Sequence, residues 1–308
     1  MQLCRHGTGV ILRSHIARFL WVALSLVLLA GCASPDMSRV DVALPDDPCC
    51  RNAERHPRGL VAVLDTVAPV FGRAVALVRW RTGYLGRHAD AQQAILAELR
   101  PLDIVLVSNK QRLSGHTIPG LFGHAAIYLG SERQLRDAGL WSAISEQERE
   151  AIARGMVFLE ADSRGVHLSL ARTTLETDRA LVLRPTIDGT LRRREALTQF
   201  LATLGTPFDF HFDADTPACV FCTELIKRVL PELRLKSHRV YGRNLIFPDE
   251  VARAALDGHR RLKPRLYLVG DREGWRIAPA AQARADINAE WRRKQAANHA
   301  APVQASQN

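Results

Sequence analysis

The feature that most constrains the fold is a series of short apolar segments in the middle of the chain, separated by turn-forming residues. Each segment has the length of a β-strand, and several are rich in Val, Ile and Leu. The predicted strands cover residues 103–107, 124–129, 157–161, 166–170, 179–184 and 265–269. With helices before and after them, these strands predict an α+β fold built on an antiparallel sheet of about five or six strands.

Helical patterns flank and interrupt the predicted strands. The expected helices cover residues 89–99, 145–154, 191–204 and 222–230. Ser145-x-x-Glu148 resembles a capping box at the start of the second of these helices, and Pro231 ends the last one. Residues 60–80 predict one or two further amphipathic helices, interrupted near Pro69. We expect their apolar stripe to pack on the core and not to insert into a membrane.

The N-terminus has the features of a targeting segment. Its three arginines precede the apolar run 19–30, which is too short to span a bilayer comfortably but suits a signal peptide. The run ends in Leu29-Ala30-Gly31-Cys32, which resembles the bacterial lipobox, and that resemblance implies lipidation of Cys32. An ordinary secretory signal is the alternative. Ala33, in place of Asp, favours the outer membrane facing the periplasm.

The chain therefore divides into four parts. We expect a signal peptide at 1–31 and a Pro- and Asp-containing tether at 32–56. One globular domain with N-terminal helices follows at 57–270, and its length suits a single well-packed core. The Ala-, Gln- and Arg-rich segment 271–308 is predicted to be peripheral or disordered.

The charge of the chain limits its partners. Removing the predicted signal peptide, which carries three arginines and no acidic residue, lowers the formal net charge from +10 to +7. A basic chain in the cell envelope favours anionic lipid head groups or anionic wall polymer, while nucleic acid is not expected there. Solvated surface arginines are the alternative explanation.

Three residues combine into a chemical hypothesis. Cys222 opens a predicted helix, where the helix dipole favours a thiolate. His124 stands at the mouth of a predicted strand and can take and return a proton. Glu160 lies within an apolar strand, where an ionisable side chain is costly unless it is paired or functional. A carboxylate there can fix the tautomer of the imidazole.

Together these motifs resemble the YiiX/YaeF-type permuted papain-like hydrolases, relatives of the NlpC-type cell-wall peptidases. The matching pieces lie between residues 103 and 230: the Asp-Ile-Val strand, the His strand, the apolar-Glu-Ala strand, Leu-Gly-Thr-Pro-Phe-Asp-Phe and Phe-Cys-Thr-Glu. The resemblance implies a papain-like fold in which the His strand precedes the Cys helix. It places the nucleophile on Cys222, the base on His124 and the orienting acid on Glu160.

Four further residues are assigned to the cleft or its support. We expect Tyr128 in the core or cleft wall and Asp209 in a turn near the site, while Phe221 and Thr223 flank the nucleophile. Two departures from the family pattern stand out. Phe221 occupies a position where relatives often have Tyr, and Gly123 one where they often have Ser.

Other interpretations of the same residues remain open at this point. Cys222 fits a small buried hydrophobic residue, and Glu160 fits an ion pair with a strand neighbour such as Arg184. Cys219 and Cys222 have the spacing of a disulfide or, with a histidine, of a metal site. Cys49 and Cys50 are adjacent, so a bond between them would be strained, and either can pair with Cys219. The rival bases are His116, His167 and His211.

The sequence thus predicts an envelope cysteine hydrolase that acts on an amide through a thioester, with no cofactor and no metal. A peptide amide of the cell wall is the preferred substrate. A lipid-directed acyl hydrolase or acyltransferase is one alternative, and a catalytically relict binding or scaffold lipoprotein is the other.

Overall fold

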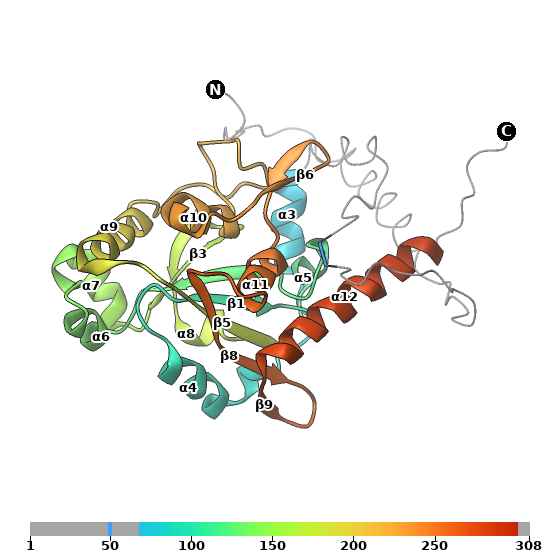
Figure 1. Ribbon diagram of the computed structural model, residues 1–308, viewed down its shortest axis with the longest axis horizontal. Helices are drawn as coiled ribbons and strands as arrows, with labels where there is room; N and C mark the ends of the chain where they lie inside the picture. Colours follow the sequence, from blue (N-terminus) through green and yellow to red (C-terminus); the bar gives the residue numbers. More distant parts are fainter. Residues whose placement is uncertain (1–48, 51–67, 301–308) are drawn as a thin grey trace, which may run out of the picture.

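The computed structural model describes residues 49–50 and 68–300, and its centre is a seven-stranded antiparallel sheet (Figure 1). The strand order is β4-β3-β2-β1-β5-β8-β9. The strands are β1 (Ile104–Ser108), β2 (His124–Tyr128), β3 (Phe158–Asp162), β4 (Gly165–Ser169), β5 (Arg179–Pro185), β8 (Leu262–Gly270) and β9 (Trp275–Ala278). A separate hairpin pairs β6 (His238–Val240) with β7 (Arg243–Leu245).

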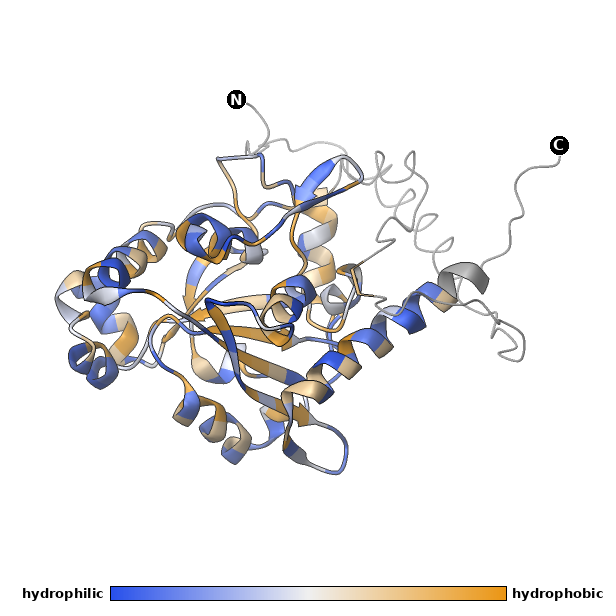
Figure 2. Cartoon of the chain, viewed as in Figure 1, coloured by the Kyte–Doolittle hydropathy of each residue, from blue (hydrophilic) through white to orange (hydrophobic). Residues whose placement is uncertain are grey.

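The central strands are apolar because they are covered on both sides. Every residue of β1 is buried, and β5 is buried over most of its length. Their side chains, with those of β2, β3 and β8, form one continuous hydrophobic core. Figure 2 shows these strands as the most hydrophobic part of the ribbon. Burial of this apolar area is the main force that holds the sheet and its helices together.

Helices cover the sheet and connect its strands. They are α3 (Ala68–Leu77), α4 (Ala89–Glu98), α5 (Ser114–Thr117), α6 (Glu132–Asp137), α7 (Glu146–Ala153), α8 (Ala171–Thr174), α9 (Gly189–Leu201), α10 (Cys222–Val229), α11 (Pro248–Leu256) and α12 (Ala280–Ala300). Single 3₁₀ turns occur at Leu85–Arg87, Trp141–Ala143 and Pro231–Leu233. α10 packs against β2 and β3, whereas α11 and α12 pack against β8 at the other end of the sheet (Figure 1).

The α+β prediction is confirmed, and all six expected strands are present within two or three residues of their predicted limits. The capping box at Ser145 is also present, since its hydroxyl accepts from the Glu148 N–H and the Glu148 carboxylate accepts from the Ser145 N–H. The central sheet has one additional strand, β9, which pairs with β8 at its edge, and the hairpin of β6 and β7 was not predicted either. β9 is only four residues long, so it did not stand out within the predicted tail.

The prediction of a peripheral or disordered segment after residue 270 needs correction over β9 and the described part of α12. Ala283, Ile287 and Trp291 lie four residues apart on one face of α12, and all three are fully buried. Tyr267 of β8 donates a hydrogen bond to Asp286 at 2.7 Å. The helix is polar on its remaining faces, so the sequence shows only a narrow apolar stripe.

The N-terminal predictions lie mainly outside the described residues. These are the signal peptide at 1–31, the lipidated Cys32, and the tether at 32–56 apart from Cys49 and Cys50, which are joined by a disulfide. Within the described part of the chain, no helix is both long and apolar enough to cross a bilayer.

Candidate active site

Two neighbouring strands bring His124 and Glu160 together. In the antiparallel pair of β2 and β3, Ala126 lies opposite Glu160. His124 is two residues before Ala126 and shares its face of the sheet, so it lies diagonally across from Glu160. The His124 Nε2 and the Glu160 Oε2 are 2.8 Å apart. The register of two strands therefore fixes the imidazole against a carboxylate.

Cys222 reaches the same imidazole from the start of α10. This helix packs against both β2 and β3, and Cys222 is its first residue. The Cys222 side chain lies beside His124 and, with Glu160, raises the pKa of its imidazole. Because Nε2 of the ring faces Glu160, Nδ1 is the nitrogen left for the sulfur. The structure thus brings together all three residues that the sequence singled out for catalysis.

The site is enclosed, and its charges are strongly coupled. Cys222 is 5% exposed, and the side chains of His124 and Glu160 are 15% and 7% exposed. Burial alone lowers the pKa of His124, but its hydrogen bonds to Cys222 and Glu160 and their negative charges raise that pKa well above 6.5. Burial raises the pKa of Glu160, yet His124 outweighs it and brings that pKa to about 2. The carboxylate and the imidazolium therefore stabilise each other.

Two hydroxyl groups complete the surroundings of Glu160, and the sequence analysis missed both. Thr174 donates to the Glu160 Oε1 at 2.7 Å from the short helix α8. Ser169 on β4 also hydrogen-bonds Glu160 and lowers its pKa. A buried carboxylate needs hydrogen-bond donors, so the Ser and Thr residues that follow the strand of Glu160 could have indicated these contacts in the sequence.

The alternative interpretation, in which Glu160 forms an ion pair with Arg184, is not what the structure shows. Arg184 instead pairs with Asp103 at 2.7 Å and with Glu98 at 3.2 Å. The buried Asp103 also accepts from the Arg100 N–H. This separate ion pair supports the connection between α4 and β1.

The Pro-Phe-Asp-Phe run lies beside the segment that leads into the nucleophile helix. Phe208 forms a parallel bridge with Val220, and the Asp209 N–H donates to the Val220 carbonyl at 3.2 Å. The buried Asp209 carboxylate accepts from the backbone N–H groups of His211 and Asp213 at 2.8 and 2.7 Å. As predicted, Asp209 holds a turn near the site.

The residues on either side of Cys222 fix the start of α10. The Phe221 N–H donates to Glu224, and the Phe221 ring packs against Phe212 with centroids 5.6 Å apart. The buried Thr223 hydroxyl donates to the Ile246 carbonyl at 2.6 Å. Burial raises the pKa of Glu224 to about 7, against the effect of the Arg228 charge. These contacts hold the first turn in position.

Tyr128 belongs to the core and supports the site from a distance. It is 4% exposed, its ring packs on Phe158, and its hydroxyl donates to Gln134 at 2.7 Å. Burial raises the pKa of Tyr128 to about 12.

The rival histidines have other contacts. His116 lies 3.1 Å from the Lys110 carbonyl and stacks beside Trp80. His167 contacts the Gly165 carbonyl and the Ser169 hydroxyl, each at 3.0 Å. The His211 backbone N–H donates to Asp209. Of these histidines and His124, His124 is the one that the structure places against Cys222.

The loop before His124 is anchored by a buried carboxylate on α11, which the sequence analysis did not identify. Asp249 accepts from the backbone N–H groups of Leu121 and Phe122, each at 2.8 Å, and from the Trp291 indole at 2.7 Å. Burial raises the pKa of Asp249 to about 6, although these donors oppose the shift. The C-terminal helix α12 thereby reaches the strand that carries the imidazole.

Gly120 shows how closely this anchor fits. Its φ is +106°, and a Cβ at this position would fall 2.2 Å from the Asp249 Oδ2. Lys110 adds a second support, since its ammonium donates to the carbonyls of Gly115 and Gly120 at 2.8 Å each. Burial lowers the pKa of Lys110 to about 8. Only glycine leaves room for the carboxylate under this loop.

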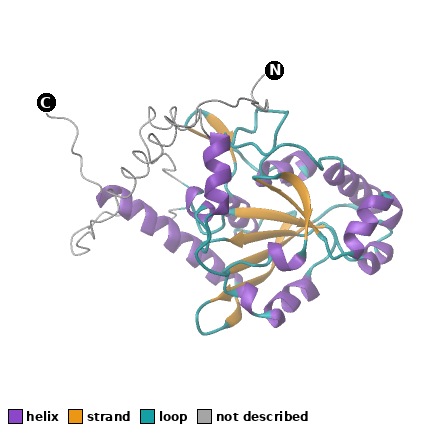
Figure 3. Ribbon diagram, turned by 180° about the vertical axis from the view of Figure 1, so that it is seen from behind, coloured by secondary structure: helices purple, strands orange, loops and turns teal. Residues whose placement is uncertain are grey.

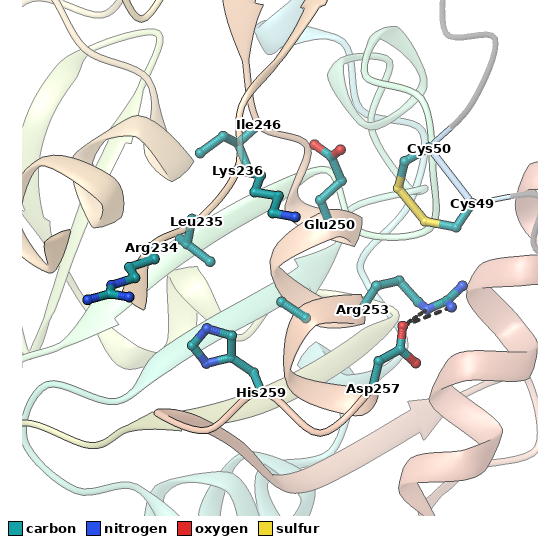
Figure 4. Close-up of a pocket in the computed structure, with 11 residues that line it drawn as sticks. Cys49, Cys50, Arg234, Leu235, Lys236, Ile246, Glu250, Arg253, Asp257 and His259 are labelled. Carbon is teal, nitrogen blue, oxygen red and sulfur yellow. Dashed lines mark hydrogen bonds and ion pairs between the residues drawn. A yellow bond between two sulfur atoms is a disulfide. The ribbon is translucent and has the colours of Figure 1, made fainter. Parts of the chain in front are cut away.

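A hollow of about 320 Å³ lies apart from the three candidate catalytic residues (Figure 4). Its lining includes the Cys49–Cys50 disulfide, Arg253, Asp257 and His259. Arg253 already pairs with Asp257 at 2.9 Å and contacts Asn288. Ile246 also lines the hollow, and its carbonyl accepts from Thr223.

The structure decides between some of the disulfide pairings that the sequence left open. Cys219 and Cys222 do not form a disulfide, and the disulfide among the described cysteines joins Cys49 to Cys50. Within residues 49–50 and 68–300, no cluster of three or more His, Cys, Asp or Glu side chains could hold a metal ion.

A thiol at a helix start, an imidazole and a buried carboxylate, in hydrogen-bonding series on an antiparallel sheet, are the site of a papain-like cysteine hydrolase. The comparisons with known proteins agree. The chain belongs to the permuted papain-like amidase enzymes of the YaeF/YiiX family, whose model matches residues 98–269, more than half of the sequence. The match begins at Glu98, the last residue of α4, and includes six of the seven strands of the central sheet, all except β9.

Among solved structures, the chain is similar to the metalloprotein yiiX from Escherichia coli O157:H7. The two sequences are 11% identical, and the alignment covers 54% of this chain and 96% of that one, with a TM-score of 0.38. A comparison with curated proteins found no match.

Proposed function

We propose that this cysteine hydrolase cleaves amides through a thioester on Cys222, with His124 as the general base and Glu160 as the group that orients the imidazole. The observation that carries the proposal is the position of His124 between Glu160 and Cys222. The ring cannot turn without losing one of its two partners. An oriented imidazole beside a thiol at a helix start is the arrangement that nucleophilic acyl transfer requires.

The reaction follows from these contacts. The Cys222 thiol gives its proton to His124, and the sulfur attacks the amide carbon to form a tetrahedral adduct. His124 then returns the proton to the leaving nitrogen as the C–N bond breaks, which leaves a thioester and a free amine. A water molecule, deprotonated by His124, attacks the thioester and releases a carboxylic acid and the thiol.

The start of α10 supplies groups for the charge that develops on the substrate oxygen. The first N–H groups of a helix have no partner within the helix, and Cys222 is the first residue of α10. We therefore assign the Cys222 N–H to the oxyanion site, where donors stabilise the tetrahedral adduct.

For the location we propose the bacterial cell envelope, with a lipid on Cys32 and the domain on the periplasmic side of the outer membrane. The support is the order of features at the N-terminus: arginines, an apolar run and a small-residue motif that ends in Cys. In that compartment the proposed substrate is a peptide amide of the cell wall.

A lipid-directed acyl hydrolase or acyltransferase is the second candidate. The observation that favours it is the apolar outer face of α3, where Leu77 is 84% and Val70 is 72% exposed. This helix packs through Gly72 on Phe210, in the run that leads to Cys222. An amphiphilic substrate could therefore approach the site along an apolar surface.

Labelling of the thiol tests the proposal. A thiol-directed acyl probe should label the wild type and not Cys222→Ala. Cys219→Ala is the matched control, because it removes another buried cysteine three positions earlier and should keep the label. Equal labelling of the wild type and Cys222→Ala would disprove the assignment of the nucleophile.

Substrate incubations separate the candidate functions. Wall peptides, phospholipids and N-acyl lipids are incubated with the wild type and with Cys222→Ala, and the products are identified by mass spectrometry. Release of a free amine from wall peptides supports the amidase, and release of fatty acid supports the lipid enzyme. A relict scaffold would convert none of them.

A further inference from the structure

The large apolar side chains on the surface gather around one helix. Within the described residues, eight large hydrophobic side chains are exposed, and only Leu191 and Ile277 lie elsewhere. The other six form the α3 patch: Val70, Phe71, Leu77, Val78, Trp80 and Leu113. The sequence analysis expected this stripe to pack on the core. That expectation is wrong, since Val75 is the buried residue of α3.

The inner side of α3 is fixed, which determines where the α3 patch points. A Cβ on Gly72 would fall 2.4 Å from the Phe210 ring, and the Arg73 guanidinium lies 5.5 Å from the centre of that ring. Phe210 in turn packs on Phe208. Because Gly72 faces Phe210, the long aliphatic side chains of Val70 and Leu77 are left on the outside of α3, which is the upright helix near the top of Figure 3.

The patch continues from α3 to the loop that borders the site. The Leu113 N–H donates to the Val78 carbonyl at 3.0 Å, and the Trp80 ring stacks beside His116 at 5.5 Å. Gly115 lies close to Gly123, the residue before His124. A Cβ placed on Gly123 would be 3.8 Å from the Gly115 Cα. The α3 patch and the mouth of the site are therefore parts of one surface.

A small excess of positive charge borders the patch. Residues 68–81 and 109–117 contain five Lys and Arg residues and no Asp or Glu. Three of the five are paired with carboxylates elsewhere in the chain: Arg79 with Glu176 and Arg81 with Asp178, each at 2.6 Å, and Lys110 with Glu290 at 3.7 Å. Arg73 is exposed at the edge of the patch. An apolar centre with basic residues at its edge is a pattern of surfaces that lie on anionic membranes.

We propose that the α3 patch docks on the surface of an anionic phospholipid bilayer and presents the site to it. Of the described helices, α3 is the first along the chain after the proposed lipid on Cys32, and it is the helix with the apolar face. Phe71, Leu77 and Trp80 enter the interfacial region, and Arg73 contacts phosphate groups. The inference deepens the lipid-directed candidate, but it does not depend on turnover.

Quenching of tryptophan fluorescence tests the docking. The mature chain, which begins at the proposed lipidated Cys32 and lacks Trp21, is reconstituted into phosphatidylethanolamine–phosphatidylglycerol vesicles that contain brominated acyl chains, which quench only indoles within the bilayer. Trp80→Phe should remove most of the quenching, whereas Trp275→Phe should retain it. Equal quenching in the two variants would overturn the proposal, as would the absence of quenching in the wild type because another part of the chain or a second copy covers the patch.

Surface substitutions supply the matched comparison. Phe71→Ser with Leu77→Ser should lower the quenching of Trp80 several-fold, and Leu191→Ser, at an equally exposed leucine far along the chain, should leave it unchanged. Thermal unfolding confirms that all variants fold. Cys222→Ala should dock like the wild type, so that a failure of the proposed chemistry is distinguished from a failure of docking. Undiminished quenching in the α3 double variant would contradict the inference.

Discussion

Two buried carboxylates at different places in this molecule have pKa values shifted in opposite directions. Glu160, beside the imidazole at the site, has its pKa lowered to about 2, while Asp249, under the loop before β2, has its pKa raised to about 6. Both are almost completely buried, and both accept several hydrogen bonds. The difference is the partner, because Glu160 faces an ionisable imidazole and Asp249 faces neutral N–H donors.

The comparison shows that the two carboxylates have different roles. A carboxylate beside His124 stabilises positive charge on the ring, which the proposed reaction requires whenever the imidazole carries the thiol proton. A carboxylate beside backbone N–H groups fixes the position of a loop. We therefore expect Glu160 to control chemistry and Asp249 to control geometry and stability.

The largest effect is expected from Glu160→Gln. The amide would turn its NH₂ toward His124 Nε2 while its oxygen still accepts from Thr174, and the ring would then carry its proton on the nitrogen that faces Cys222. That tautomer cannot take the thiol proton, so kcat/KM should fall about 10²–10⁴-fold. Asp162→Asn on the same strand is the control and should change kcat/KM little. A loss below tenfold in Glu160→Gln would contradict the orienting role.

The two carboxylates should also give opposite dependence of stability on pH. The depressed pKa of Glu160 stabilises the fold above its ordinary value of 4.5, and this contribution is lost as the pH falls toward 2. The raised pKa of Asp249 acts in the other direction, since its contribution is complete below 3.8 and is lost as the pH rises through 6. Shifts of about two units correspond to on the order of 3 kcal/mol each.

Denaturant unfolding over this pH range measures both slopes. The stability difference between the wild type and Glu160→Gln should grow as the pH rises from 2 to 4.5. The difference between the wild type and Asp249→Asn should shrink from 3.8 to 6. If the stability difference from the wild type changed with pH in the same way for both variants, the hydrogen-bond partners would not determine the pKa values of these carboxylates.

At a fixed pH, Asp249→Asn should destabilise the protein by about 1–3 kcal/mol, because the new NH₂ group faces N–H donors that lose their acceptor. The loop before His124 should shift, and kcat should fall with it. Asp257→Asn, at the end of the same helix, is the control. An unchanged melting temperature and kcat in Asp249→Asn would exclude the anchoring role.

Trp291→Phe should have the smallest effect. It keeps a large ring in the core but removes the N–H that donates to Asp249, which corresponds to about 1 kcal/mol of stability. Trp275→Phe removes an exposed N–H bond to Asp90 and should cost less than about 0.5 kcal/mol. Equal losses of stability in the two variants, measured by thermal unfolding, would show that the buried hydrogen bond contributes no more than the exposed one.

The sheet could be predicted because its strands are local features of the sequence. Runs such as Ile-Val-Leu-Val at residues 104–107 are apolar throughout, and their lengths and flanking turns identify them without knowledge of their partners. The residues His124, Glu160 and Cys222 could be chosen because their chemistry is unusual for their positions and because the motif order resembles a family. Their contacts then follow from strand register and helix placement.

Other features depend on contacts that no local pattern reveals. Asp249 lies 128 residues from Leu121 in the sequence, and nothing near it indicates which donors it meets. The buried face of α12 consists of single residues four apart among charged neighbours, so its composition resembles a solvated tail. For α3, the periodicity shows an apolar side but not whether the protein covers it.

The order of the pieces along the chain has a consequence for biosynthesis. The strands β2 and β3, which position the imidazole and its carboxylate, are close in sequence and pair directly. The cysteine arrives only with α10, after β5 and α9 have been made. The strands that carry His124 and Glu160 can therefore pair during synthesis, before α10 brings the Cys222 sulfur to the imidazole. Of the three residues of the site, Cys222 is therefore synthesised last, after the strands that position His124 and Glu160.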